Sequence, residues 1–254
     1  MTTPQLQTIG NKLFSQVSAM MRAENVSEWE LATIEREAKK LSDVEPGQGW
    51  IIRSAVAALK WDVEGAERFS TRAITHDPSA ETFINAAVTM GYLNRPDLAK
   101  KFAEQAKAKY GLTSKIADRV LSTNLATADI DIVTEAFNKA SAQDQSNPGF
   151  LCVNEAVAAM RVLSIEPSRL KGELSAAYEV LTLRKLRSFG IAANVELDQY
   201  DEPESVTITI FFLGQENEQL SIQGDLAVQL LEQPDWDPRT LCVTFRPSPT
   251  SNVH

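Results

Sequence analysis

The sequence predicts an α+β protein in which a stack of α-helical hairpins, residues 1–165, precedes a small acidic α-β-β-α-β domain, residues 166–254. Apolar residues recur at helical spacing from the start of the chain to about residue 188. Within that region a helix–turn–helix pattern recurs about every 33 residues. Beyond Gly190 the apolar residues alternate with a period of two, as they do in strands. These observations place the helices first and the sheet last.

The composition is that of a globular protein. Of the 254 residues, 43% are hydrophobic and 23% are charged, which allows one large or two modest cores. The opening residues have no basic segment that leads into an apolar one, and the longest apolar run, Ile208–Gly214, is far shorter than the roughly 20 residues of a membrane helix. Cys152 and Cys242 are predicted to be buried, reduced thiols, so we expect a cytoplasmic protein.

The best-defined helix pair occupies Gly49–His76. A break at Asp62–Gly65 separates its two helices, and Asp77–Pro78 ends it because the residue before a proline disfavours the α region. Small side chains in the first helix allow the second helix to approach closely. The stripe residues are Trp50, Ile51, Ser54, Ala55, Ala57 and Leu59 in the first helix, and Ala66, Phe69, Ala73 and Ile74 in the second.

Two further pairs repeat this design. Ala99 and Ala106 lie 33 residues after Ala66 and Ala73, and a turn at 94–97 separates their helix from the one before it. The third pair continues at a spacing of 34 residues and ends at 147–149. Its stripe consists of Val133, Phe137 and Ala140.

Over residues 47–148 this pattern resembles the tetratricopeptide repeat. Arg53 stands where that repeat expects leucine, Ser70 where it expects an aromatic residue or alanine, and Gly111 where the second pair should close with proline. The resemblance implies a superhelical stack whose concave face binds a partner. The best-matching positions are Trp50, Ser54, Ala57, Ala66, Ala73 and Pro78.

The concave face implied by this register is apolar. The family's best-known peptide mode grips a C-terminal carboxylate with lysine and asparagine, and here only Asn85 is suitable, so we expect a helix in the groove instead. Another explanation remains open, in which the same residues pack against the N-terminal helices or the C-terminal domain. The inner-face residues are Ile51, Ala55 and Leu59 in the first pair, and Ile84, Val88 and Tyr92 in the second.

The remaining elements are assigned from the same periodicities. Leu6–Met21 and a helix from about Trp29 to Leu41 form a degenerate first pair, and Phe150–Leu163 and Arg169–Arg187 are later helices. In the C-terminal domain we expect two helices on one sheet, the first of them being Arg169–Arg187. Its other elements are an antiparallel hairpin of strands Ala193–Tyr200 and Val206–Leu213, a short helix Asp225–Leu231 and a third strand Leu241–Phe245.

The charge of the chain is divided unevenly. The net charge is −9, and all of it falls after Ser188, where eleven acidic residues face Arg239 and Arg246 alone. A negatively charged surface repels the phosphates of nucleic acid and favours basic partners, although such a surface also keeps a protein in solution. We therefore expect no direct contact with nucleic acid.

No catalytic constellation, cofactor motif or metal-ligand spacing is found. The two histidines have no cysteine or serine partner at a recognisable spacing, and glycine-rich phosphate loops are absent. Trp236 lies in an acidic loop, where it either anchors a partner or caps the sheet core.

These observations favour a non-enzymatic interaction protein (an adaptor, assembly factor or regulator, in the style of a bacterial or phage accessory protein) that binds another protein through its helical stack. The alternative is an acidic, antitoxin-like inhibitor whose C-terminal domain covers a basic nucleic-acid-binding protein or nuclease. Neither hypothesis involves a membrane. The candidate partner-binding residues are Ile51, Ala55, Leu59, Ile84, Asn85, Val88, Tyr92 and Trp236.

Overall fold

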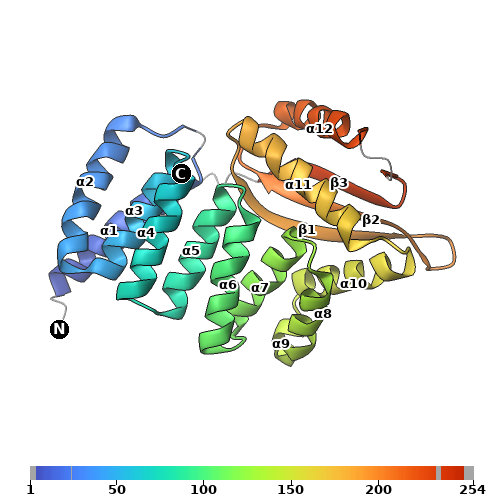
Figure 1. Ribbon diagram of the computed structural model, residues 1–254, viewed down its shortest axis with the longest axis horizontal. Helices are drawn as coiled ribbons and strands as arrows, with labels where there is room; N and C mark the ends of the chain where they lie inside the picture. The colour runs from blue at the N-terminus through green and yellow to red at the C-terminus, as the bar shows by residue number, and fades with distance from the viewer. Residues whose placement is uncertain (1–3, 24, 233–235, 249–254) are drawn as a thin grey trace. The chain divides into compact units, whose positions relative to one another are not determined.

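The computed structural model describes residues 4–23, 25–232 and 236–248, and its α+β fold confirms the predicted class (Figure 1). The chain divides into two compact units, Met1–Ala106 and Lys107–Pro249. This division differs from the boundary expected at residue 165, because helices that the sequence pattern assigns to the repeat stack pack against the sheet.

The first unit is a stack of antiparallel helices, and the predicted pairs are present within it. From α1 to α5 each helix packs on its neighbours in sequence, and α3 also contacts α1 and α5. The last turn of α6 falls in the second unit by the division above. The helices are α1 (Pro4–Met21), α2 (Glu28–Val44), α3 (Pro46–Leu59), α4 (Val63–His76), α5 (Ala80–Tyr92) and α6 (Pro96–Tyr110).

Local sequence explains where these helices begin. The side chains of Ser27, Asp62 and Ser79 each accept a hydrogen bond from a backbone N–H in the first turn of the helix that follows. Proline opens α3, where its missing N–H costs nothing.

Small residues hold the centre of this unit together. A Cβ atom on Gly49 would lie 2.3 Å from the backbone nitrogen of Ser42, so α2 and α3 meet at backbone contact. Ser54 donates to the carbonyl of Ala66 at 2.9 Å and shares a 2.7 Å hydrogen bond with Ser70, and both serine side chains are fully buried. Ser70 departs from the repeat pattern because it pairs with Ser54.

The second unit contains six helices among the residues that the structure describes. Helix α8 contains Val133 and Phe137 of the predicted third pair, and α7 precedes it as the first helix of that pair, for which no residues had been assigned. The short α9 was not predicted, and α12 begins at Glu216 rather than at Asp225. The early start of α12 follows from a capping box, in which Glu218 accepts from the backbone N–H of Gln215 at 2.8 Å. These helices are α7 (Ser114–Ala126), α8 (Ile130–Lys139), α9 (Ala142–Gln145), α10 (Pro148–Val162), α11 (Pro167–Leu183) and α12 (Glu216–Leu230).

The sheet has the strand order β1-β2-β3, with β1 Ser188–Leu197, β2 Pro203–Phe212 and β3 Leu241–Pro247. The first two strands form the predicted antiparallel hairpin, and β3 runs parallel to β2 after the crossover through α12. The predicted α-β-β-α-β order is therefore present. Strand β1 begins five residues earlier than expected, since Gly190 and Ala192 dilute the alternation of large apolar residues.

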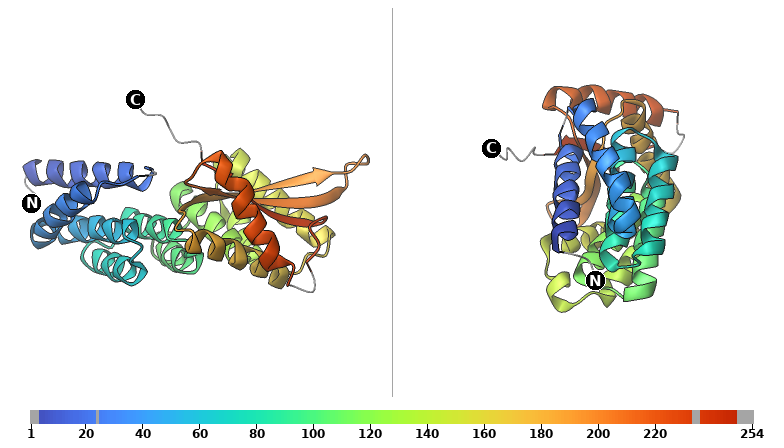
Figure 2. Two further views of the ribbon diagram at one scale, coloured as in Figure 1. Left: turned by 90° about the horizontal axis from the view of Figure 1, so that it is seen from above. Right: turned by 90° about the vertical axis from the view of Figure 1, so that its left-hand side faces the viewer.

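Both faces of this sheet are covered. Helix α12 contacts β3 and α11, whereas α10 contacts β1 and β2 and α7 contacts β1. The sheet lies between α12 and α10 in Figure 1, and Figure 2 shows α12 crossing over the strands. Burial on both faces explains why Ile208, Thr209 and Ile210 are all buried. The expectation of two helices on one sheet is thus incomplete, because two repeat-like helices cover the opposite face.

Candidate functional site

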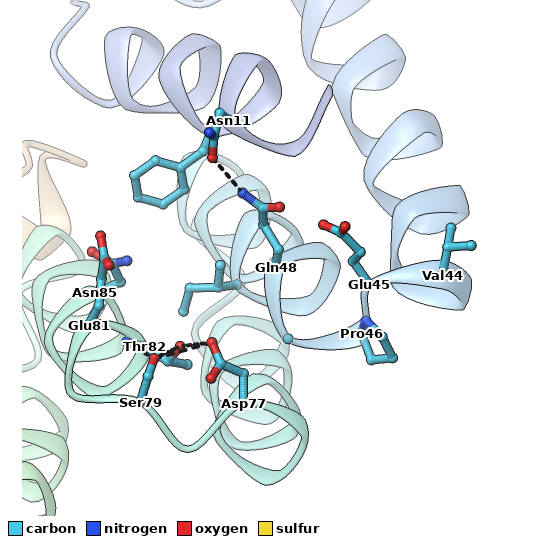
Figure 3. A pocket seen from close by; sticks show the side chains of 13 residues that line it. Asn11, Val44, Glu45, Pro46, Gln48, Asp77, Ser79, Glu81, Thr82 and Asn85 are labelled. Carbon is cyan, nitrogen blue, oxygen red and sulfur yellow. Dashed lines mark hydrogen bonds between the residues drawn. The ribbon is translucent and has the colours of Figure 1, made fainter. Parts of the chain in front are cut away.

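The candidate site is a groove in the first unit between α1, α3 and α5 (Figure 3). It consists of a larger pocket of about 520 Å³ and a smaller one of about 180 Å³. Phe14, Ile51 and Asn85 line both pockets, so the two form one continuous depression. Its size falls in the range of pockets that bind ligands or peptide side chains.

Helix α1 forms one wall of this groove. Its buried side chains Leu13, Val17 and Met21 hold it in the stack, and α1 contacts α3 directly. Gly10 allows this approach, because a Cβ there would lie 1.9 Å from the amide oxygen of Gln48. The Gln48 side chain donates to Asn11 Oδ1 at 3.1 Å and ties the two helices together across the groove.

The larger pocket has an acidic end. Glu45, Asp77 and Glu81 line it, and its lining includes no lysine or arginine. Asp77 accepts hydrogen bonds from Ser79 at 3.2 Å and Thr82 at 2.9 Å, which fixes its carboxylate beside the start of α5. Glu45 Oε1 is buried and has no hydrogen-bond partner among the described residues. This end of the groove therefore favours a cationic donor.

Most of the residues that line the smaller pocket are apolar. Aliphatic and aromatic side chains from α1, α3 and α5 surround it, and Arg22 is its one basic lining residue. Such a surface fits the apolar stripe of an amphipathic segment. The apolar lining residues are Phe14, Val17, Met21, Ile51, Ala55, Val88 and Tyr92.

Five of the eight candidate partner-binding residues line this groove, namely Ile51, Ala55, Asn85, Val88 and Tyr92. Leu59 is 8% exposed and belongs to the core, and Ile84 is half-buried on α5 without lining either pocket. Trp236 lies in the other unit, half-buried in the segment between α12 and β3. The contributions of α1 and of Glu45 at the α2–α3 junction were not predicted, although the sequence spaces Phe14, Val17 and Met21 on one side of a helix.

The alternative explanation for the inner-face residues was that they pack against the N-terminal helices or the C-terminal domain. Ile51 and Ala55 are 5% and 7% exposed, so α1 and the neighbouring helices already cover most of their surface. Val88 and Tyr92 are half-buried and remain accessible in the smaller pocket. The N-terminal helix thus covers part of the face and leaves the groove along its side.

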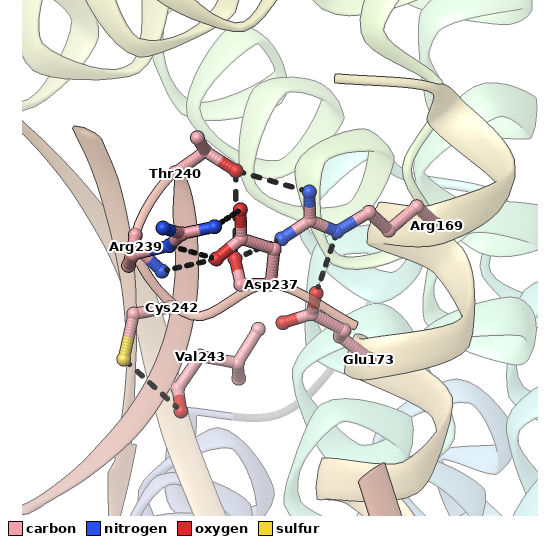
Figure 4. Close-up of polar contacts among 7 residues, drawn as sticks. All are labelled: Arg169, Glu173, Asp237, Arg239, Thr240, Cys242 and Val243. Atoms are coloured by element: carbon pink, nitrogen blue, oxygen red, sulfur yellow. Dashed lines mark hydrogen bonds and ion pairs between the residues drawn. The ribbon is translucent and has the colours of Figure 1, made fainter. Parts of the chain in front are cut away.

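A second polar cluster lies in the other unit, where α11 meets the segment before β3 (Figure 4). Arg169 pairs with Glu173 at 3.1 Å, donates to Thr240 Oγ1 at 3.0 Å and bonds the carbonyl of Asp237. Burial raises the pKa of Glu173 to about 7, with Arg169 opposing the shift. The Glu173 side chain is fully buried, which leaves it no contact with a substrate, and we interpret the cluster as structural.

The cysteine prediction is half wrong. Both cysteines are free, but Cys152 is exposed, because it lies on the outer side of α10 while Val153 and Ala156 face the core. Cys242 is half-buried on β3, and its burial together with the nearby charge of Glu173 raises its thiol pKa.

Among the residues that the structure describes, no group of histidine, cysteine and acidic side chains has a geometry that could hold a metal ion. Within the same residues, no helix combines the length and apolarity that a bilayer crossing requires.

No protein-family model, curated protein or solved structure matches this chain. The resemblance to the tetratricopeptide repeat therefore stays a prediction.

Proposed function

We propose that this protein is a non-enzymatic interaction module, acting as an adaptor, assembly factor or regulator, that holds a segment of a partner protein in the groove between α1, α3 and α5. The observation that carries the proposal is the continuity of the two pockets through Phe14, Ile51 and Asn85. Helical stacks of this kind present extended concave surfaces, because each pair needs its neighbours to complete a core.

The two ends of the groove specify the chemistry of the partner segment. Glu45, Asp77 and Glu81 favour a lysine or arginine at one end. The apolar end, around Val88 and Tyr92, favours aliphatic side chains. A short segment with both features, about two helical turns apart, complements the groove.

Site-specific cross-linking tests this proposal. A photoreactive phenylalanine analogue at Tyr92, which replaces one aromatic ring by another, should capture a partner in cells of the source organism. Val88→Arg should abolish that cross-link by filling the smaller pocket. Thr75→Arg adds the same charge at an exposed position on α4 outside both pocket linings and should leave it unchanged. If the Tyr92 analogue captures the partner equally well alone, with Val88→Arg and with Thr75→Arg, the groove does not bind the partner.

A second candidate function is supported by the outer face of α12. Leu220, Val228 and Leu231 are 83%, 65% and 70% exposed, and α12 carries no basic residue. Large apolar side chains exposed in one stripe mark interaction surfaces, and the acidic surroundings suit a basic partner. In this alternative the protein is an antitoxin-like inhibitor that covers a basic nucleic-acid-binding protein or nuclease.

Salt and mutation separate the two candidates. If the acidic unit binds the partner, raising the salt from 50 to 300 mM should weaken binding by about tenfold or more, and Leu220→Lys should abolish it. A partner that is insensitive to salt and to Leu220→Lys, but lost with Val88→Arg, belongs to the groove.

A further inference from the structure

Three arginines gather around two aromatic rings on α3 and α4 of the first unit. Trp50 and Phe69 stack with ring centroids 5.5 Å apart and an interplanar angle of 28°. The guanidinium of Arg53 lies 4.3 Å from the Trp50 centroid and 4.5 Å from that of Phe69. Arg72 lies 4.7 Å from the Trp50 centroid, and Arg68 lies 5.0 Å from that of Phe69. We refer to these five residues as the arginine–aromatic cluster.

This cluster is separate from the groove. On α3, Trp50 and Arg53 project from a different side of the helix than Ile51 and Ala55, because successive residues are rotated by about 100°. None of the five residues lines either pocket. Arg68 and Arg72 are exposed, so their donors are accessible to a ligand.

The charges of the cluster are not neutralised by ion pairs. Among the described residues, no carboxylate lies within ion-pair distance of Arg53, Arg68 or Arg72. Burial lowers the pKa of the Arg53 guanidinium and is the largest effect on it. Glu35 raises this pKa, Arg72 and Arg68 lower it, and Asp43 raises it by less. Arg53 Nε is buried and has no hydrogen-bond partner in the same residues. The mutual repulsion of like charges that make no direct ion pair is relieved when an anion binds.

The rings prepare the arginines for such an anion. Stacking on an aromatic face holds a guanidinium plane by cation–π attraction and leaves its N–H edge free. A stacked arginine therefore loses little additional freedom when it binds an oxyanion in a bidentate manner.

We infer that the arginine–aromatic cluster is a docking site for an acidic segment of a protein partner, one that presents carboxylate or phosphoryl oxygens beside an apolar side chain. The oxyanions bind the edges of Arg68 and Arg72, and the apolar side chain contacts the exposed parts of Trp50 and Phe69. A long nucleic acid fits less well. Its phosphates would continue beyond the arginines and meet Glu35 and Asp43, which act on Arg53 from α2, whereas a short acidic segment can end at the arginines.

Peptide titration tests this inference with the full chain. The probes are a peptide with two glutamates flanking a leucine, the same peptide with glutamines, a phosphoserine version and a single-stranded oligothymidine. Binding is followed by the ¹H–¹⁵N resonance of the Arg53 Nε–H group. Arg68→Gln and Arg72→Gln change exposed residues and should preserve the fold. Arg119→Gln, which removes a partly exposed arginine paired with Asp118, is the matched control.

The acidic or phosphorylated peptide should shift the Arg53 resonance, and each cluster variant should weaken its binding about tenfold or more while the control binds normally. The glutamine peptide should not bind. Two results would overturn the inference. Absence of any shift with either anionic peptide would make the cluster purely structural, and tighter binding of oligothymidine than of the peptides would make it a nucleic-acid site.

Discussion

Glu173 shows how burial changes the chemistry of a single residue. Its side chain is fully buried on α11, and while Oε1 pairs with Arg169, Oε2 is buried without a hydrogen-bond partner among the described residues. Burial outweighs the attraction of Arg169 and raises the pKa of Glu173 from its usual 4.5 to about 7. The nearby Cys242 thiol on β3 is affected in turn, since the charge of Glu173 contributes to its raised pKa.

This shift predicts a pH dependence of stability. Because the pKa of Glu173 is higher in the folded state than in the unfolded state, its favourable contribution is complete below about pH 4.5 and is lost as the pH rises through about 7. The loss amounts to about 3 kcal/mol. Glu173→Gln should remove that dependence, so urea unfolding at pH 5 and pH 8 should show the variant gaining stability relative to the wild type at pH 8. A stability difference that is the same at both pH values would contradict this assignment.

At the scale of elements, most helices could be predicted from the sequence. The pairs α3–α4 and α5–α6 have clear stripes, side-chain caps at α4 and α5, and prolines near their boundaries. Helix α12 was predicted too short, because its first turns are polar and Leu220 is exposed, so no apolar stripe marks them. Where a helical turn is stabilised by a capping box rather than by core contacts, the sequence shows little apolar periodicity.

Gly49 determines how closely α2 and α3 pack. In Gly49→Ala the new Cβ would lie 2.3 Å from Ser42 N and 2.8 Å from the carbonyl carbon of Leu41, and backbone atoms cannot move aside as a side chain can. We expect a loss of about 1–3 kcal/mol in the free energy of unfolding, despite the better helix propensity of alanine. Gly91→Ala is the control, because its Cβ meets nothing within 4 Å. It should be neutral or slightly stabilising in the same thermal or urea unfolding measurement.

Gln223 protects the open edge of β3. Its side-chain amide donates to the Val243 carbonyl at 3.1 Å and accepts from the Phe245 N–H at 3.3 Å, as a neighbouring strand would. Gln223→Leu should cost about 1–3 kcal/mol and increase aggregation, because two backbone groups lose their partners. Unfolding curves and light scattering at increasing concentration would measure both effects. Gln219→Leu on the same helix is the control, and equal behaviour of the two variants would argue against edge protection.

At the scale of the whole molecule, the division of the chain at Ala106 makes a prediction about fragments. Because α7 and α10 cover β1, a fragment that begins at residue 112 should unfold cooperatively, whereas one that begins at 166 should expose apolar surface and aggregate. Calorimetry of the two fragments would measure this difference. A cooperative, soluble fragment 166–254 would instead support the boundary expected from the sequence.

Part of the candidate groove could be predicted from the sequence. The register of α3 and α5 identified Ile51, Ala55, Asn85, Val88 and Tyr92, because residues on one helix face are fixed by the 3.6-residue period. The acidic end was not predicted. Glu45, Asp77 and Glu81 come from different segments, and only the packing of α3, α4 and α5 against one another brings them together around one pocket.

The sequence alone determined the fold class, the helix pairs and the hairpin, because periodicity, caps and prolines act within a few residues of one another. Only the tertiary structure decided that α7 and α10 pack on the sheet, that α1 lines the groove, and that Arg53, Arg68 and Arg72 share two rings. The reason is physical. An apolar face specifies that it must be buried, but the partner that buries it is chosen by the shape and volume of the whole core.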